Sequence, residues 1–211
     1  GAYLADVRAL DTAGVDSLWL GGDGDGYEPW LLLASIAAVT GQARLVAPVT
    51  AADGSVPAAF DTRVATLAQL SRRRSVLSVA AAAHDNGVEA MIGAARRAGH
   101  RVILETAGRA QAQTAARLAD GLVSLDDSPE HLRAALDGIA RPEEAPAPAD
   151  RFEVWARIAM PADRESWRRM RDELESAGAT GVIVPADPRL LDLLRNGDEE
   201  EDRSDLGLAQ G

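Results

Sequence analysis

The sequence predicts an α/β protein built around a parallel β-sheet. Apolar residues alternate along the chain between helical and strand spacing, and helical stretches of about 10–15 residues separate the strands. Two strand stretches, SVLSVA at 75–80 and RVILE at 101–105, are almost continuously apolar, as expected of strands buried on both faces. Strands joined by helices in this way form βαβ units, in which neighbouring strands run parallel.

Glycine and proline mark the element boundaries in the first half of the chain. Gly14 follows the first helical stretch and Gly21 follows the first strand. Pro29 and Pro57 suit the first turn of a helix, where a backbone N–H is not needed. With these boundaries the sequence predicts helices at 3–13, 29–40, 57–71 and 86–98, and strands at 17–20, 44–49 and 75–80.

The second half continues the alternation around a proline-rich loop at 141–150, which holds three prolines. The predicted strands are 101–105, 121–125, 152–159 and 181–185, and the predicted helices are 109–119, 129–139, 162–177 and 188–195. Seven strands do not by themselves decide between a doubly wound sheet and a barrel. A complete eight-fold barrel typically needs about 250 residues, so a barrel here would be shortened or incomplete. We expect one domain at 1–195 and a flexible acidic tail at 196–211.

Composition excludes several classes of function. The formal net charge of −11 argues against binding to nucleic acid or to an anionic membrane surface. Cysteine is absent and all 22 basic residues are arginine, so neither a thiolate nor a Schiff-base lysine is available. The sequence shows no apolar run of about 18 residues and no leader pattern, so we expect a cytoplasmic protein.

Ligands of parallel α/β sheets bind at the carboxyl ends of the strands, so the strand-to-helix loops carry the candidate sites. The most informative loop is Thr106-Ala107-Gly108-Arg109, which follows a buried strand and begins a helix. Backbone N–H groups at a helix N-terminus favour an anion, and Arg109 adds a charge and Thr106 a hydroxyl. The loop is therefore a candidate phosphate site; the alternative is an ordinary N-capped turn.

Two other loops carry polar residues. GGDGDG at 21–26 lacks the spacing of a dinucleotide-binding loop, and we favour a flexible glycine-rich turn over a cation site at Asp23 and Asp25. His84 follows the strand at 75–80 and is a candidate general base, the alternative being a solvent-facing side chain. His100 and His131 are expected to be structural and solvated, respectively, and the three histidines are not spaced as a zinc site.

Short motifs recur in a fixed order along most of the chain. They are GVDSLWL at 14–20, EP at 28–29 followed by LASIAAVT at 33–40, and AARLADG at 115–121. In this order they resemble the luciferase-like flavin-dependent monooxygenase family. That family includes bacterial luciferase, the alkanesulfonate and nitrilotriacetate monooxygenases, and F420-dependent reductases.

The resemblance implies a (β/α)₈ barrel, usually dimeric, that binds reduced FMN or F420 at the strand carboxyl ends. It places the flavin phosphate in the loop before AARLADG, on Thr106, Gly108 and Arg109. By the same analogy, three residues at or just past strand ends line the pocket, and one histidine is the candidate for proton transfer. The three pocket residues are Asp23, Thr50 and Ser78, and the histidine is His84.

The chain also departs from the family pattern. It lacks the long segment that relatives carry between Ala80 and Arg101, and Asp23-Gly24 stands where relatives have aspartate-histidine. One hypothesis is an oxidoreductase that uses reduced FMN and O₂ on a small organic substrate, with F420 as the alternative cofactor. A second is a non-catalytic flavin-binding homologue, and a third is an unrelated α/β protein. Expected partners are a small-molecule substrate, a flavin reductase, a longer homologous subunit, or a second copy in a homodimer.

Overall fold

The computed structural model shows one seven-stranded sheet whose strands follow one another in chain order, from β1 to β7. It describes residues 2–21, 28–49, 59–80, 86–137, 139 and 152–195. Every neighbouring pair of strands is parallel. This sequential order has no reversal point, so it is the order of a barrel and not of a doubly wound sheet.

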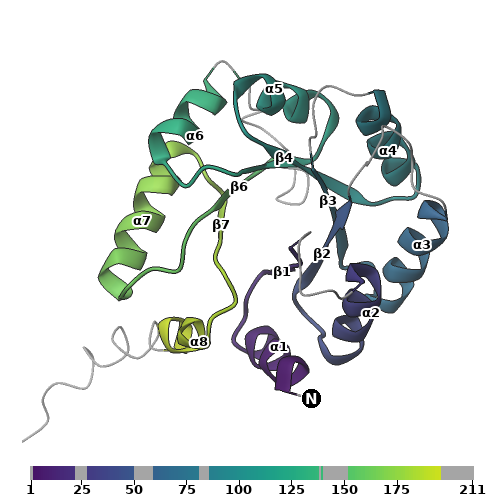
Figure 1. Cartoon of the computed structure of the whole chain (residues 1–211), viewed down its shortest axis with the longest axis horizontal. Helices are drawn as coiled ribbons and strands as arrows, with labels where there is room; N and C mark the ends of the chain where they lie inside the picture. Colours follow the sequence, from purple (N-terminus) through teal and green to yellow (C-terminus); the bar gives the residue numbers. More distant parts are fainter. Residues whose placement is uncertain are drawn as a thin grey trace, which may run out of the picture.

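The strands are short, and each lies within a stretch that the apolar pattern predicts, except that the strand predicted at 101–105 extends to Thr106. They are β1 (Ser17–Trp19), β2 (Arg44–Val49), β3 (Ser75–Ala80), β4 (Arg101–Thr106), β5 (Gly121–Ser124), β6 (Glu153–Arg157) and β7 (Gly181–Ile183). They gather at the centre of the molecule, and the helices form an outer ring around them (Figure 1). The sheet curls into a nearly closed barrel with β1 and β7 at its two edges, which confirms the shortened (β/α)₈ prediction.

The helices that the structure describes lie on the outside of the barrel. They are α1 (Ala2–Thr12), α2 (Pro29–Val39), α3 (Phe60–Leu70), α4 (Asn86–Arg97), α5 (Arg109–Leu118), α6 (Pro129–Leu136), α7 (Arg164–Ala177) and α8 (Pro188–Arg195). Of these, α2 to α7 connect successive strands, α1 precedes β1 and α8 follows β7. Side-chain caps fix several starts: Glu28, Ser128 and Asp163 each accept a backbone N–H of the first turn. None of the helices in these ranges is both long and apolar enough to cross a bilayer.

Several helix boundaries differ from the predicted ones by one or two residues, and two differ by three residues. The helix predicted at 129–139 ends at Leu136, because Asp137 has extended backbone angles and leaves the helix. The helix predicted at 57–71 begins at Phe60, because Ala59 has left-handed backbone angles, and Pro57 lies outside the described part. The loop at 141–150 and the tail from 196 also fall outside it.

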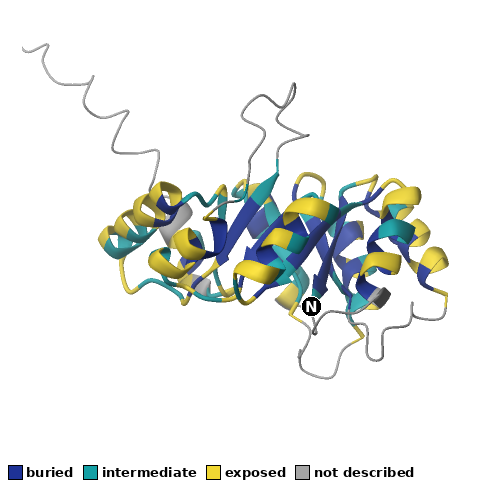
Figure 2. Ribbon diagram, turned by 90° about the horizontal axis from the view of Figure 1, so that it is seen from above, coloured by how far each residue is buried: buried dark blue, intermediate teal, exposed yellow. Residues whose placement is uncertain are grey.

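The main core lies between the outer face of the sheet and the helices. Its centre includes Leu33 and Ile36 of α2, Leu77 of β3, Leu104 of β4 and Leu122 of β5, all at most 1% exposed. Figure 2 shows the strands buried inside the molecule and the exposed residues on the outer faces of the helices. This packing leaves the carboxyl ends of the strands at one end of the barrel.

Asp11, at the end of α1, ties that helix to the turn before β2. Its carboxylate accepts the backbone N–H groups of Gly41, Gln42 and Ala43 at 2.8, 3.1 and 2.7 Å. Burial by itself would raise the pKa of Asp11. The three N–H groups and the Arg74 guanidinium outweigh burial, and the pKa lies below its usual range.

We expect Asp11→Asn to lower the free energy of unfolding by about 1–3 kcal/mol at pH 7, because an amide cannot accept all three N–H groups. A carboxylate with a lowered pKa contributes stability above its unfolded pKa, near 3.8, and loses it as pH falls through the folded value. The difference between wild type and variant should therefore shrink below about pH 4. Urea unfolding at pH 7 and pH 3 measures this. A difference that stays constant between these pH values would contradict the assignment, and exposed Asp6→Asn is the control.

Candidate functional site

Strand alternation sends every second side chain into the barrel, where one apolar layer fills its middle. The buried members of this layer are Val46, Val76, Ile103, Val123 and Trp155, with Trp19 and Ile183 packed against them. The two tryptophans meet edge to face across the interior, with ring centroids 5.5 Å apart. The layer separates two polar layers, one at each end of the barrel.

The layer at the amino ends of the strands consists of mutually paired charges. Glu153 of β6 receives two hydrogen bonds from Arg44 of β2, at 2.8 and 3.0 Å, and pairs with Arg101 of β4 at 2.9 Å. Its carboxylate also accepts the indole N–H of Trp155 at 2.8 Å. A cavity of about 1,090 Å³ opens here. Asp16 also pairs with Arg44, so two carboxylates balance the two arginines. Because these charges are matched, and because this end of a barrel serves stability, we do not place the functional site here.

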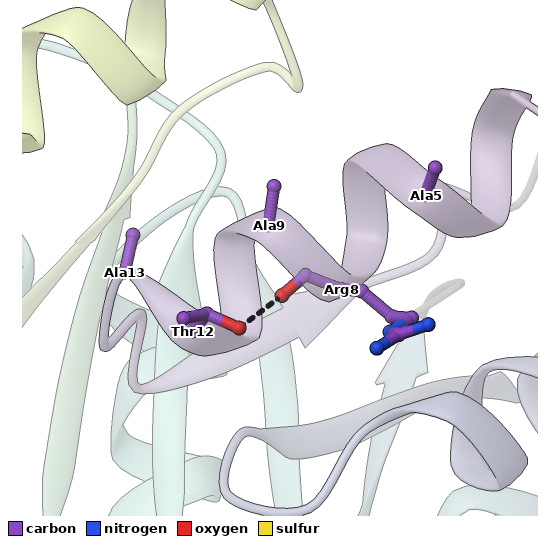
Figure 3. Close-up of a pocket in the computed structure, with 5 residues that line it drawn as sticks. All are labelled: Ala5, Arg8, Ala9, Thr12 and Ala13. Atoms are coloured by element: carbon purple, nitrogen blue, oxygen red, sulfur yellow. Dashed lines mark hydrogen bonds between the residues drawn. The ribbon is translucent and has the colours of Figure 1, made fainter.

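A second cavity of about 460 Å³ lies beside α1. Ala5, Ala9 and Ala13 contribute methyl groups to it, and Thr12 donates its hydroxyl to the carbonyl of Arg8 at 2.8 Å (Figure 3). The cavity lies on the helical surface and has no carboxylate or imidazole among its described lining residues. It therefore offers no acid–base chemistry.

The layer at the carboxyl ends of the strands brings together Ser78, Glu105 and Arg157. Each residue lies two positions beyond a member of the apolar layer on its own strand, so it faces the interior. The Ser78 hydroxyl donates to Oε1 of Glu105 at 2.9 Å, and Nη2 of Arg157 lies 3.7 Å from the same oxygen. We call these three residues the mouth cluster.

Burial makes the mouth cluster energetically significant. The side chain of Glu105 is only 19% exposed and that of Arg157 is 44% exposed. A charged group placed directly above an apolar layer loses hydration. This loss costs free energy unless the charge is paired with an opposite charge or hydrogen-bonded. Sequence reasoning identified Ser78 and missed the two charged residues. The sequence does indicate them, because Glu105 and Arg157 each lie two residues after an apolar residue that faces the barrel interior.

The predicted phosphate loop lies at the same end of the barrel. Gly108 precedes α5 with extended backbone angles and supplies no side-chain cap, whereas the N–H of Ala107 in the same loop donates to Oε1 of Gln111 at 2.6 Å. A Cβ added at Gly108 would meet no atom within 4 Å, which indicates open space. Arg109 forms an exposed ion pair with Asp137 at 3.3 Å. The hydroxyl of Thr106 is buried and donates to the Val123 carbonyl at 3.2 Å, so it faces the sheet.

Three residues that the sequence assigned to the site lie outside the described residues. They are Asp23, Thr50 and His84. The structure therefore brings together Ser78 and the start of α5 at one end of the barrel and leaves the other three as predictions.

The two described histidines lie where the sequence expected them. His100, before β4, is 8% exposed, and its Nδ1 lies 3.5 Å from the Ser75 hydroxyl. Burial lowers its pKa, so the neutral ring is the favoured form. His131, in the first turn of α6, is exposed, and its Nδ1 contacts Oδ2 of Asp126 at 2.7 Å. That hydrogen bond raises the pKa of His131.

Comparisons with known proteins give structural matches only. No family model and no curated protein matches the chain. The matching solved structures include the coenzyme F420-dependent tetrahydromethanopterin reductase of Methanopyrus kandleri, with a TM-score of 0.66 and 14% identity over 92% of this chain and 91% of that chain. An F420-dependent secondary alcohol dehydrogenase, solved with an F420–acetone adduct, matches with a TM-score of 0.67 and 12% identity, over 92% of this chain and 91% of that chain.

The EDTA monooxygenase of Chelativorans sp. BNC1 matches with a TM-score of 0.52 and 12% identity, over 83% of this chain and 59% of that one. The chain shares the fold of these enzymes. All three belong to the luciferase-like superfamily that the sequence motifs resemble, and at 12–14% identity the likeness shows a shared fold.

Proposed function

We propose that the chain is an oxidoreductase that binds a flavin or deazaflavin at the carboxyl ends of its strands. The observation that carries the proposal is the fold, which two F420-dependent enzymes share over about nine tenths of both chains. The mouth cluster and the start of α5 support it, because they place polar groups at the end of the barrel where such folds bind ligands. The substrate is a small organic molecule that enters the same mouth.

The residues at the start of α5 fit a cofactor phosphate. The N–H groups of the first turn supply donors, and the absence of a side chain at Gly108 leaves room for close approach. The Arg109–Asp137 pair is exposed on both sides, 54% and 73%, so it is weak and the guanidinium can exchange its carboxylate for a phosphate. Thr106 contributes its place at the strand end, since its hydroxyl is already bound to the sheet.

Two cofactors fit this arrangement. Reduced FMN supplies reaction with O₂ in a monooxygenase, whereas F420 supplies hydride transfer in a reductase or dehydrogenase. The neighbours support a cofactor of the flavin or deazaflavin class, and both FMN and F420 belong to the proposal. A homodimer, and a separate reductase that supplies reduced FMN, belong to the proposal as partners. The short segment between Ala80 and Arg101 favours the second candidate, a cofactor-binding chain without turnover of its own.

Titrating the protein with FMN and with F420, each oxidised and reduced, tests the proposal by fluorescence quenching. We expect micromolar or tighter binding of one cofactor. Arg109→Ala should weaken binding about tenfold, as the loss of one charge-assisted contact predicts. Arg117→Ala, which removes another exposed arginine of α5, is the matched control and should leave affinity unchanged. Absence of binding for both cofactors up to millimolar concentration would refute the proposal. Turnover by the isolated chain would exclude the non-catalytic candidate.

A further inference from the structure

Glu105 and Arg157 place a hydrogen-bond acceptor and a hydrogen-bond donor side by side in the barrel mouth. We propose that this pair binds the pyrimidine edge of the cofactor ring, with Glu105 accepting the ring N–H and Arg157 donating to the adjacent ring carbonyl. The inference rests on the proposed function and names the residues that select the ring. Ser78 is the positioning residue, because its hydroxyl holds Oε1 of Glu105 at 2.9 Å.

Both groups keep hydrogen-bonding capacity for a ligand. A carboxylate offers about four lone-pair sites on two oxygens, and Ser78 uses one of them. The 3.7 Å separation between Arg157 and Glu105 is an ion-pair distance longer than a hydrogen bond. The guanidinium, with its five N–H donors, therefore remains able to bind a second acceptor.

The charges decide which class of ligand fits. An anionic group drawn to Arg157 would be repelled by Glu105, and a cationic group drawn to Glu105 would be repelled by Arg157. A neutral edge that carries an N–H beside a carbonyl satisfies both residues. Flavins and 5-deazaflavins share such an edge, an imide N–H between two carbonyl groups, so the inference holds for either cofactor.

The apolar layer beneath the mouth cluster strengthens the preference for a ligand that donates an N–H to Glu105. Val76, Ile103 and Trp155 lie one inward position below Ser78, Glu105 and Arg157, and all three are at most 7% exposed. A ring seated above them replaces the remaining water around the carboxylate. A ligand that could not donate to Glu105 would leave a desolvated carboxylate oxygen without a partner, which is costly.

Lumiflavin and 3-methyllumiflavin separate this contact from the phosphate contact, because neither carries a phosphate and only the first has the ring N–H. We expect the wild-type protein to bind lumiflavin at least about tenfold more tightly than the methylated form, measured by fluorescence quenching. The same ratio is expected for 5-deazalumiflavin and its 3-methyl derivative. In Glu105→Ala the ratio should fall to about one, and in Ser78→Ala it should fall part of the way.

Glu89→Ala, which removes an exposed glutamate of α4, is the control and should keep the wild-type ratio. Thermal unfolding of each variant shows whether it is folded, and the ratio of two affinities is insensitive to a partly unfolded fraction. Binding of both ligands by the wild type with equal affinity would overturn the inference and leave the proposed function standing. Failure of the wild type to bind these rings, FMN and F420 would overturn both.

Discussion

Replacing Glu153 with glutamine is expected to destabilise the protein more than any other single change considered for this fold. Glu153 is the one carboxylate that joins Arg44, Arg101 and the indole of Trp155. Its side chain is 14% exposed, and those of the two arginines are 26% and 29% exposed. Removing its charge takes away the carboxylate that Arg44 and Arg101 share, while Asp16 still pairs with Arg44. Breaking a part-buried network of this kind costs at most about 3–5 kcal/mol.

For a chain of this length that loss corresponds to a fall in Tm of about 6–20 °C, measurable by calorimetry or circular dichroism. Asp172→Asn is the matched control, because it removes the charge of an exposed pair with Arg171, 64% and 54% exposed. The control should change the stability by less than about 1 kcal/mol. Equal effects of the two substitutions would show that the charged layer does not hold the barrel together.

The second large effect is expected for Gly181→Ala at the start of β7. A Cβ at this position would lie 2.4, 2.6 and 2.9 Å from three atoms of the Trp155 ring. The ring cannot move away easily, because Trp19 packs on its edge and Arg44 lies over it, 5.4 Å from the ring centroid. We expect destabilisation of about 1–3 kcal/mol from this overpacking.

Urea unfolding measures the cost, with Gly41→Ala as the control because its added Cβ would meet nothing within 4 Å. A Trp155→Leu background provides the second test. With the ring removed, Gly181→Ala should cost much less, and the difference is the interaction energy of the pair. A cost that is unchanged in that background would place its origin elsewhere.

Periodicity was sufficient to place the strands and helices, because each strand is a short apolar run bounded by glycine, proline or polar residues. The predicted boundaries of β2, β3 and α8 are those of the structure. Composition could not decide how the sheet closes, because strand order depends on packing between distant segments. The resemblance to a barrel family supplied that prediction, and the sequential strand order confirms it.

The candidate site was harder to predict, because the register of strand pairing decides which residues of different strands lie side by side. Ser78, Glu105 and Arg157 come from three strands and are far apart in sequence. Their contact requires that β3, β4 and β6 lie in one sheet and that each strand presents the same face to the interior. Position at a strand end identified Ser78, whereas Glu105 was read only as the last residue of an apolar run. Thr106, its neighbour, faces the other way by the same alternation.

The start of α5 is the half of the candidate site that the sequence proposed, and it stays a prediction. Its signal is local, since a buried strand followed by a glycine and a helix fixes the position of the backbone N–H groups. The mouth cluster is its non-local counterpart. In the proposal, the start of α5 binds the phosphate of the cofactor and the mouth cluster binds its ring.

A crystal structure of the protein with bound FMN or F420 would show at which end of the barrel the cofactor lies. We predict electron density for the ring in the barrel mouth, within hydrogen-bond distance of Glu105 and Arg157, and the phosphate at the first turn of α5 beside Arg109. Density for the cofactor at the amino ends of the strands, in the cavity next to Glu153 and Trp155, would contradict this prediction.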